Sequence, residues 1–504
     1  MFYDSRRSRL RRAVWTAGLL GIVLATAAQA ANKVLKDEWM AMYMGAQKMG
    51  YAHTRTVEQK TDDGALYVTE VEEHMVLARG AVQMAVGASQ RVVEGEDGRV
   101  REFEQEMDLG GNIMAVRGRV KDGKLVITMG EGPNAQQQAV EVPDGLCPWA
   151  VEKATLAKGL APGTMFELPI FLAQAPGRAC TATAAVGEME EVSVFEIKKW
   201  LHRVEVEVSA YPGLKVVTWV DKDGQAWLSR TSMGGIQIEL RRVSKELALS
   251  PNTAAELMVS FAIRPDRPIV RPRERESLTL LLKPTADAAK NRTLPEDPLQ
   301  SVKPHKDGLL VTVRKAKGDP KKSYSLPYKG KEWAGLLRPT AWLESEDPLI
   351  VGMSKAAVGG EGDALEAAYR IEQYVRKVMT NKGLGVGFAT ALETARQKAG
   401  DCTEHAVLTT ALARAAGIPS RLVVGMAYTE AFVGGVRNSF LYHMWTEVYV
   451  GEWLPIDAAM GAHDATHVAL GRSNLDSPGA MLEISAIMPA FLGSTEISVL
   501  ESRE

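Results

Sequence analysis

Cysteine, charge of one sign and long apolar runs are all scarce in this sequence. Only 3 of the 504 residues are cysteine, which is too few for a fold stapled by many disulfides. The formal net charge is −2, and this near balance gives no indication of a nucleic-acid partner, so we expect none. One apolar run lies near the N-terminus and no second long one follows, so the rest of the chain is expected to fold as an exported protein without a membrane span.

The N-terminus has the three parts of a secretory signal peptide. Residues 5–12 are strongly basic, residues 13–27 are apolar but short for a bilayer span, and residues 28–30 form a small-x-small cleavage site. We therefore predict a signal peptide over residues 1–30 and a periplasmic or extracellular location. Residues 5–7 also resemble a twin-arginine signal, so Sec and twin-arginine export both stay open. Retention of the segment as an anchor is the alternative.

The scarce cysteines fall into two groups. In an oxidising compartment Cys147 and Cys180 could form a disulfide, which would leave Cys402 as the odd thiol. Alternatively, Cys147 and Cys180 are both buried and unpaired, because free cysteine is among the most buried residue types. In both cases Cys402 is an unpaired thiol.

The chain is long enough to need more than one hydrophobic core, because it has 504 residues. Residues 31–249 alternate between apolar and polar side chains in segments separated by Asp-Gly pairs, which favour tight hairpin turns. This pattern predicts an antiparallel β-rich domain, built as a sandwich or a curved sheet. A short helix expected over residues 151–158 interrupts the pattern and could divide the domain into two lobes.

Three further segments are expected after this domain. Residues 250–340 begin as a connector rich in proline and arginine and continue as a small β module. Residues 341–475 are expected to form an α+β catalytic core, and residues 476–504 a C-terminal extension of β structure that could return to the N-terminal sheet. The strands expected in the small module are 278–282, 309–313 and 323–326.

The catalytic core centres on a cysteine at the first turn of a helix. Apolar residues recur at helical spacing from Ala406 to Ala415, and Gly417 ends the helix. Asp401 is the expected N-cap, so Cys402 lies where the helix dipole stabilises an anion. Together with a nearby imidazolium, this position would lower the pKa of a thiol from ~8.5 to roughly 3.5–7.5. The pattern therefore predicts a nucleophilic thiolate at neutral pH.

A base and the residue that orients it are expected on a β-hairpin further along the chain. Residues 442–450 are rich in aromatic and β-branched residues and predict a buried strand that carries His443 near its start. Residues 451–452 make the turn, and residues 453–457 return as a strand that ends at Asp457. The hairpin would make the histidine and the aspartate cross-strand neighbours, which completes a Cys-His-Asp nucleophilic triad.

Two other features are expected in the core. Asp363 and Glu366 match a capping box before an apolar pattern with helical spacing, which predicts a packing helix without a chemical role. Residues 383–387 are rich in glycine and predict a flexible loop at the border of the active-site cleft.

Four blocks of this core resemble the bacterial branch of the transglutaminase-like superfamily. The blocks are residues 400–406, 415–421, 443–449 and 455–457. The resemblance extends from about Trp342 to about Ser473 and implies a papain-like core. It implies that Cys402 is the nucleophile, His443 the base and acid, and Asp457 the orienting carboxylate. The bacterial members of this superfamily are mostly regarded as cysteine proteases or amidases.

The resemblance has two departures from the animal crosslinking enzymes. The sequence has no acidic calcium loops, and no upstream tryptophan aligns with the second oxyanion-hole donor of those enzymes. We expect no metal and no other cofactor. For the oxyanion we expect the backbone N–H of Cys402 as a donor, with the side chain of Gln397 as a second candidate by analogy with papain-like enzymes.

Two other assignments of the histidines compete with this triad. His405 follows Cys402 by three residues on the same helix and could be the base, although neighbouring helix positions give poor geometry for proton transfer. A zinc site would also satisfy ligand spacing, although it leaves the expected base and its carboxylate without a role. Its ligands would be Cys402, His405, His463 and His467.

The sequence thus predicts an exported cysteine peptidase or amidase that acts by thiolate acyl transfer on peptide or carboxamide substrates. Peptides or proteins of the cell envelope are the expected partners. Water would release the acyl group in a hydrolase and an amine would release it in a crosslinking transglutaminase, so the triad alone leaves both reactions open. A third alternative is a non-catalytic scaffold of the cell envelope with a vestigial triad.

Overall fold

The computed structural model describes the chain in segments. They are residues 32–62, 64–79, 82–130, 135–211, 214–233, 236–256, 262–285, 293–381, 389–432, 435–476, 480 and 495–503. The expected signal peptide over residues 1–30 and the expected loop over residues 383–387 lie outside the described residues.

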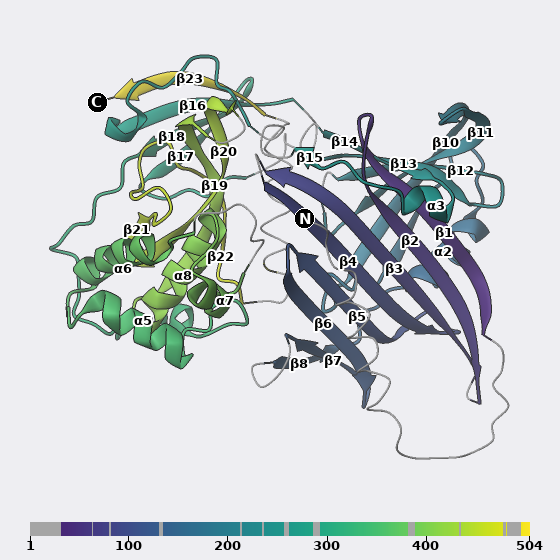
Figure 1. Ribbon diagram of the computed structural model, residues 1–504, viewed down its shortest axis with the longest axis horizontal. Coiled ribbons are helices and arrows are strands. Elements are labelled where there is room, and N and C mark those ends of the chain that lie inside the picture. Colours follow the sequence, from purple (N-terminus) through teal and green to yellow (C-terminus); the bar gives the residue numbers. More distant parts are fainter. Residues whose placement is uncertain are drawn as a thin grey trace.

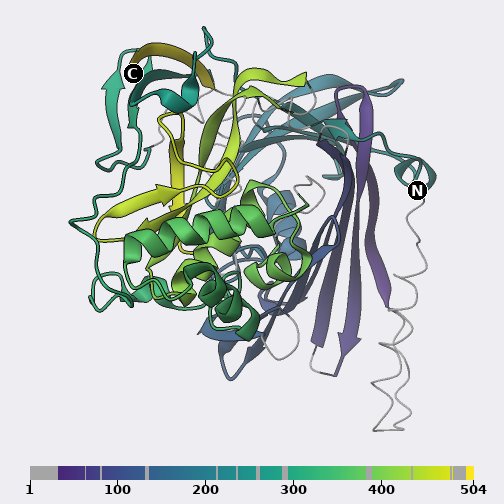
Figure 2. The ribbon, with the colours of Figure 1, turned by 60° about the vertical axis from the view of Figure 1, so that its left-hand side comes forward.

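The N-terminal part forms one curved antiparallel sheet. Strands β1 to β8 pair in chain order on one side, strands β9 to β14 do so on the other, and pairing of β1 with β14 joins the two sides. Figure 2 shows the strong curvature of this sheet. The strands on the β1 side are β1 (Lys33–Met44), β2 (Gln47–Thr61), β3 (Gly64–Arg79), β4 (Val82–Gly95), β5 (Val100–Leu109), β6 (Asn112–Lys121), β7 (Lys124–Met129) and β8 (Gln136–Glu141). The others are β9 (Met165–Ile170), β10 (Cys180–Val194), β11 (Ile197–Val208), β12 (Lys215–Val220), β13 (Ala226–Met233), β14 (Ile236–Arg242) and the short β15 (Ala255–Glu256), which pairs with β3.

The Asp-Gly turns account for this meander. Between β6 and β7, Asp122 and Gly123 have φ of 51° and 77°, the positive values that a tight two-residue hairpin turn requires. Gly224 has φ of 77° in the turn between β12 and β13. The predicted antiparallel β-rich domain is therefore confirmed. Of the sandwich and the curved sheet left open by the sequence, the structure has the curved sheet, and its two sides are continuous instead of forming separate lobes.

A short helix connects the two sides of the sheet. Helix α2 (Pro148–Lys158) confirms the helix expected over residues 151–158. The buried carboxylate of Glu94 on β4 accepts hydrogen bonds from the backbone N–H groups of Trp149 (3.0 Å) and Ala150 (2.9 Å). These N–H groups have no partner inside the helix, so Glu94 caps α2 from the neighbouring sheet.

The cysteines of this part are buried and unpaired. Cys147 packs with Phe103 in one hydrophobic cluster, and Cys180 packs with Ile170 in another. Of the two alternatives left open by the sequence, the structure has the one without a disulfide. A short helix, α3 (Lys245–Ala248), follows the large sheet.

A small sheet follows, with the strand order β17-β18-β16-β23. Its strands are β16 (Ser277–Pro284), β17 (Gln300–His305), β18 (Gly308–Arg314) and β23 (Thr495–Arg503), and the 3-10 helix η2 (Pro272–Glu274) precedes it. The strands expected at 278–282 and 309–313 are confirmed. The sequence left open that the C-terminal β structure returns to the N-terminal sheet. Instead, β23 pairs with β16, because Ile497 and Val499 are buried against the apolar residues of this small sheet.

The strand expected at residues 323–326 is wrong. Only an isolated bridge joins Ser325 to Asp363, and the segment crosses the helical domain instead of entering a sheet. The backbone N–H of Leu326 donates to the carbonyl of Gly362, and the hydroxyl of Tyr324 donates to a backbone carbonyl of the third sheet. Bonds to the start of α6 and to β20 hold this segment, so it has no strand partner along its length.

The third unit is an α+β domain whose sheet has the order β21-β20-β19-β22. Its strands are β19 (Ser420–Ala431), β20 (Arg437–Tyr449), β21 (Trp453–Ile456) and β22 (Val468–Ser473). Its helices are η3 (Ala334–Leu337), α5 (Pro348–Val358), α6 (Ala364–Val378), α7 (Ala391–Gln397) and α8 (Cys402–Ala415). Helices α5 to α8 gather on one side of this sheet (Figure 1) and share a hydrophobic core with β19 and β20. The predicted fold class, an α+β core on the C-terminal side of antiparallel β structure, is confirmed; the exact domain boundaries stay a prediction.

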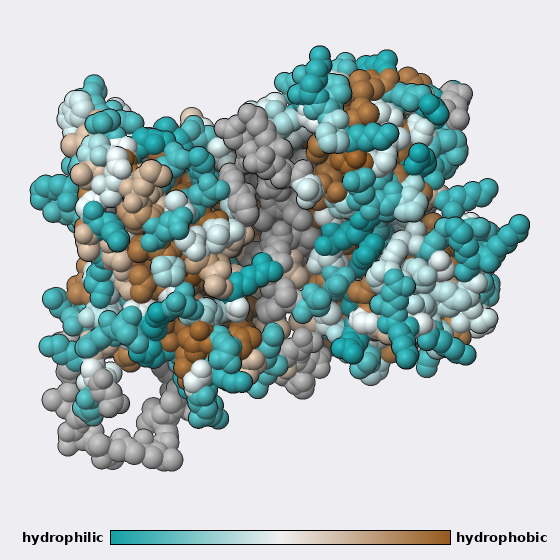
Figure 3. Space-filling view, turned by 180° about the vertical axis from the view of Figure 1, so that it is seen from behind, coloured by the Kyte–Doolittle hydropathy of each residue, from teal (hydrophilic) through white to brown (hydrophobic). Residues whose placement is uncertain are grey.

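The surface seen in Figure 3 has hydrophobic residues in small separate groups among hydrophilic ones. Scattered apolar exposure of this kind is normal on a folded protein. Among the described residues, no helix combines the length and the hydropathy needed to cross a membrane.

The cap on α2 generates a prediction about stability. Glu94→Ala leaves two N–H groups of α2 without an acceptor in a buried place, so we expect unfolding free energy to fall by about 1–3 kcal/mol. Urea unfolding followed by circular dichroism measures this change. Glu104→Ala on the neighbouring strand β5 is the matched control, because Glu104 is exposed and its substitution should change stability by no more than about 0.5 kcal/mol. Equal stabilities of the two variants would contradict the capping role.

Candidate active site

Helix α8 begins at Cys402, as the sequence predicts. The carboxylate of Asp401 accepts a hydrogen bond from the backbone N–H of Thr403 at 2.9 Å. In return, the carboxylate of Glu404 accepts one from the backbone N–H of Asp401 at 2.9 Å. This capping box fixes the direction in which the chain enters α8 and therefore the position of the cysteine.

The predicted hairpin is also present. Strands β20 and β21 pair antiparallel, with Thr446 opposite Ile456 and Tyr449 opposite Trp453. His443 lies in the middle of β20 and not near its start, because β20 extends further towards its N-terminus to pair with β19. Asp457 directly follows the end of β21.

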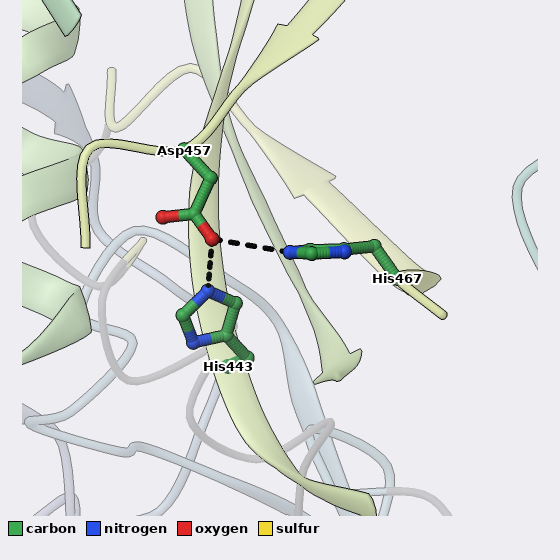
Figure 4. A group of neighbouring side chains, drawn as sticks. All are labelled: His443, Asp457 and His467. Carbon is green, nitrogen blue, oxygen red and sulfur yellow. Dashed lines mark hydrogen bonds and ion pairs between the residues drawn. The ribbon is translucent and has the colours of Figure 1, made fainter. Parts of the chain in front are cut away.

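The hairpin brings His443 and Asp457 into direct contact. Nε2 of His443 lies 2.7 Å from Oδ2 of Asp457, and both side chains are buried (Figure 4). The other carboxylate oxygen accepts hydrogen bonds from the backbone N–H groups of Ala459 (2.8 Å) and Met460 (3.1 Å). An ionised carboxylate only accepts, so Nε2 carries the proton and Nδ1 keeps its lone pair for a proton from elsewhere.

Cys402 lies beside the same strand. The backbone N–H of Met444, the residue after His443, points at the thiol. Strand β21 pairs with β20 only from Thr446 onwards, so the backbone of Met444 lies beyond the end of β21. Cys402 is partly exposed, and within the described part of the chain its thiol makes no hydrogen bond to His443. The structure thus joins His443 to Asp457 and places Cys402 nearby at the end of α8.

The protonation state of the thiol differs from the sequence expectation. Burial raises the pKa of Cys402 well above its ordinary value, the negative charge of Asp401 adds to this effect, and the N–H of Met444 opposes it. Glu404 and Asp457 also raise it. The sequence predicted a thiolate at neutral pH from the helix N-terminus and a nearby imidazolium, but burial and the charges of Asp401, Glu404 and Asp457 act in the opposite direction.

The two oxyanion-hole candidates lie in different surroundings. Gln397 is exposed at the last position of α7. The backbone N–H of Cys402 belongs to the first residue of α8, where no acceptor exists within a helix, and no described residue accepts a hydrogen bond from it. The role of Gln397 stays a prediction. The backbone N–H of Cys402 lies at the start of α8 and can donate a hydrogen bond to a bound group.

A second histidine contacts the same carboxylate oxygen. Nε2 of His467 lies 3.1 Å from Oδ2 of Asp457, and both imidazoles point at this oxygen in Figure 4. On its other side, Nδ1 of His467 lies 3.2 Å from Oδ1 of Asp464. His467 is buried, so these two carboxylates replace the water that would otherwise surround it.

The charges of this cluster depend on one another. Burial alone would lower the pKa of His467, but hydrogen bonds and attraction to Asp457 and Asp464 raise it to about 9. Burial opposes ionisation of Asp457, yet the two histidines hold its pKa well below the ordinary value. Burial likewise opposes ionisation of Asp464, yet His467 and Arg273 hold its pKa below the ordinary value. The two carboxylates therefore favour the charged form of His467, and the backbone N–H of Asp464 also lies 3.2 Å from Nδ1 of this ring.

A third buried carboxylate approaches from α6. Glu372 accepts a hydrogen bond from the backbone N–H of Asp457 at 2.6 Å. Burial raises the pKa of Glu372 to about 7, although this hydrogen bond acts in the opposite direction, and the charge of Asp457 adds to the rise. The helix thus fixes the backbone of the residue that orients His443.

The donor atoms of His443, Asp457 and His467 lie within 4.8 Å of one another, close enough to be considered as metal ligands. However, both imidazole nitrogens point at one carboxylate oxygen at hydrogen-bond distances, and a metal ligand would need His467 to be neutral. We therefore describe the group as hydrogen-bonded and assign no metal to it.

The rival assignments are not supported by these positions. Nδ1 of His405 lies 2.6 Å from the carbonyl oxygen of Asp401, so this histidine contributes to the start of α8. Of the ligands considered for zinc, His467 binds Asp457, and His463 packs on the ring of His467 with centroids 4.6 Å apart.

Sequence reasoning missed the roles of His467, Asp464 and Glu372. One signal was available for Glu372, because it is a charged residue within the apolar face of α6, next to Ile371. The roles of His467 and Asp464 had no comparable signal, because they depend on a segment that returns to the hairpin after the triad residues.

An α+β domain with a cysteine at a helix tip and a histidine–aspartate pair on the adjoining sheet has the arrangement of the papain-like class. Residues 352–458 match the family model of the transglutaminase-like superfamily, which confirms the resemblance predicted from the sequence. The match includes Cys402, His443 and Asp457. The chain therefore contains a transglutaminase-like domain on its C-terminal side.

Further comparisons give more distant similarity. No curated protein matches the chain. A beta-barrel-like protein with a domain of unknown function from Brucella abortus is 14% identical, with a TM-score of 0.31 over 41% of this chain and 95% of its own. A candidate cysteine protease from Cytophaga hutchinsonii is 14% identical, with a TM-score of 0.29 over 46% of this chain and 85% of its own. A candidate protease from Parabacteroides distasonis is 11% identical, with a TM-score of 0.17 over 88% of this chain and 68% of its own.

The packing around the site generates a prediction about Gly425, which lies opposite His443 on β19. A Cβ there would lie 2.2 Å from the carbonyl oxygen of Val468 and 2.6 Å from the ring of Trp445. Gly425→Ala should therefore lower the unfolding free energy by about 1–3 kcal/mol, as measured by urea unfolding.

The matched control is Gly352→Ala, in the interior of α5. A Cβ at this position meets nothing within 4 Å, and alanine favours the helix over glycine by about 1 kcal/mol. This variant should be as stable as the wild type or more stable. A neutral effect of Gly425→Ala would show that the sheet accommodates a side chain beneath Trp445.

Proposed function

We propose that the protein is an exported cysteine peptidase or amidase that acts by acyl transfer on peptide or carboxamide substrates. The observation that carries this proposal is the buried 2.7 Å hydrogen bond between His443 and Asp457, which orients His443 with a free Nδ1 beside the strand that Cys402 approaches. A histidine oriented by a carboxylate next to a thiol is the arrangement needed for nucleophilic catalysis.

The reaction follows from these positions. As the sulfur of Cys402 bonds to the substrate carbonyl carbon, its proton passes to Nδ1 of His443 and the carbonyl oxygen becomes an oxyanion. The backbone N–H of Cys402 donates to this oxyanion. When the intermediate collapses, the C–N bond breaks and His443 returns the proton to the departing amine. Water then attacks the thioester with His443 again accepting a proton, which releases the acid and restores the thiol.

The raised pKa of Cys402 decides how the thiol is activated. Ionisation to solvent is unfavourable because burial and Asp401 oppose it. Transfer of the proton to His443 creates an imidazolium close to the new thiolate, so the two charges stabilise each other. The nucleophile therefore forms as an ion pair with His443, and its reactivity depends on that residue more strongly than in an exposed cysteine.

The same dependence gives the test of the proposal. We expect iodoacetamide to alkylate Cys402 at pH 7, and His443→Ala to slow this reaction at least about tenfold, because the variant has no acceptor for the thiol proton. Mass spectrometry of the peptide that contains Cys402 measures the rate. The buried Cys147 and Cys180 serve as internal controls and should stay unmodified.

His405→Gln is the matched control variant, because this histidine lies on the same helix and contacts the carbonyl of Asp401. It should leave the alkylation rate within about twofold of the wild type. Equal rates for wild type and His443→Ala would refute the catalytic pair and leave the non-catalytic scaffold. With a carboxamide peptide and a labelled primary amine, we expect release of the acid; incorporation of the label would instead identify a crosslinking transglutaminase.

Export is part of the proposal and is supported by the basic and apolar pattern of residues 1–30. We expect the mature protein from a Gram-negative host to begin after Ala30 and to appear in the periplasm or the medium. Intact-mass measurement of the fractionated protein tests this. A full-length chain confined to the membrane fraction would mean that the segment is retained as an anchor.

A further inference from the structure

One carboxylate oxygen lies at hydrogen-bond distance from two histidines in this site. Oδ2 of Asp457 lies 2.7 Å from Nε2 of His443 and 3.1 Å from Nε2 of His467, while its partner oxygen is occupied by backbone N–H groups. A triad needs only the first of these contacts. The second therefore needs an explanation of its own.

His467 is built into the fold as firmly as the triad residues are. Its side chain is buried, and its other nitrogen faces Asp464. The backbone N–H and the hydroxyl of Thr466 donate to Asp464 at 2.7 Å and 2.6 Å. The guanidinium of Arg273 pairs with the remaining oxygen of Asp464. Charges thus alternate from Asp457 through His467 and Asp464 to Arg273.

The small β module and the segment before it form hydrogen bonds to this row of alternating charges and to the backbone next to it. Arg273 belongs to η2, which precedes the module, and also donates to the backbone carbonyl of Tyr428 at 2.9 Å. Gln300 on β17 makes two hydrogen bonds to the backbone of Ala469, two residues after His467. The module therefore fixes the segment that carries His467, which gives a role to the region between the two larger domains.

We propose that His467 is a positioning residue of the active site: a buried cation that clamps Asp457, offsets its negative charge and thereby sets the proton affinity of His443. The inference rests on the proposed function for its catalytic meaning. The match to the transglutaminase-like family ends at residue 458, so His467 lies beyond the matched segment.

The physical argument is electrostatic. A buried carboxylate favours the charged form of the imidazole beside it, so the contact with Asp457 raises the proton affinity of His443. A protonated histidine could not accept the proton of Cys402. As a second cation on the same oxygen, His467 would offset part of the charge of Asp457 and weaken this preference of His443 for the charged ring.

Other charged or titratable groups also face this cluster. Glu372 from α6 bonds to the N–H of Asp457, Cys402 lies at the start of α8, His463 packs on His467, and Arg273 bonds to Asp464. Glu447 and Asp297 line a small cavity beside His467, and Arg472 pairs with both of them. Burial and the charge of His467 lower the pKa of His463 well below its ordinary value, so His463 is neutral and leaves His467 as the cation on Asp457.

The test is an NMR titration of histidine-labelled protein in a Cys402→Ala background, which removes the thiol and keeps the cluster. We expect His467→Gln to move the titration midpoint of His443 to higher pH by about one unit, because the offsetting cation is lost. His74→Gln, in the distant N-terminal sheet, is the matched control and should not move it. An unchanged midpoint in His467→Gln would overturn the proposal and reduce His467 to a packing role.

Two further measurements keep the test decisive if His467→Gln does not fold. In the Cys402→Ala protein the ring of His467 should be protonated at pH 7.5, and a neutral ring there would overturn the proposal. Asp464→Asn removes the carboxylate behind His467 and should move the His443 midpoint in the same direction. These readouts do not depend on activity, so loss of His443-dependent alkylation would reject the proposed function without deciding the role of His467.

Discussion

The carboxylate of Asp457 is the interaction on which the C-terminal domain depends. Asp457 directly follows strand β21. One oxygen of its carboxylate accepts hydrogen bonds from two backbone N–H groups, and the other contacts two imidazoles. The backbone N–H of Asp457 donates to Glu372 of α6. A buried ionised carboxylate is costly unless every lone pair is satisfied. The hairpin, helix α6 and the segment before β22 meet at Asp457 because each contributes a hydrogen-bond partner to this residue.

This constraint gives the three parts of the chain different tasks. Helix α8 presents the thiol, the hairpin presents the base, and the small module braces the segment with the second histidine through Arg273 and Gln300. The large N-terminal sheet contacts the C-terminal α+β domain through Met114 of β6, which packs against its hydrophobic core. Residues from several elements form the site, so the geometry of the site depends on how these elements pack together.

Much of the local structure could be predicted from the sequence. The start of α8 followed from Asp401 and the apolar spacing after it, and the hairpin followed from the β-branched run that contains His443. The strand expected at residues 323–326 failed because Leu326 and Tyr324 bond to separate elements of the folded domain. The low pKa expected for Cys402 failed because burial in the folded domain raises it, and the charges of Asp401, Glu404 and the more distant Asp457 add to this effect.

The sequence by itself determined the helices and strands of the site and its chemically reactive residues. These are a cysteine after an N-cap, a histidine on a strand, and an aspartate at the end of the next strand. These follow from short-range capping, periodicity and turn rules, which act within a few residues. Only the tertiary structure decided that His467 shares the carboxylate with His443, that Arg273 pairs with Asp464, and that burial raises the pKa of the Cys402 thiol. Proton affinities depend on burial and on charges a few ångströms away, and those distances exist only after separate elements have packed together.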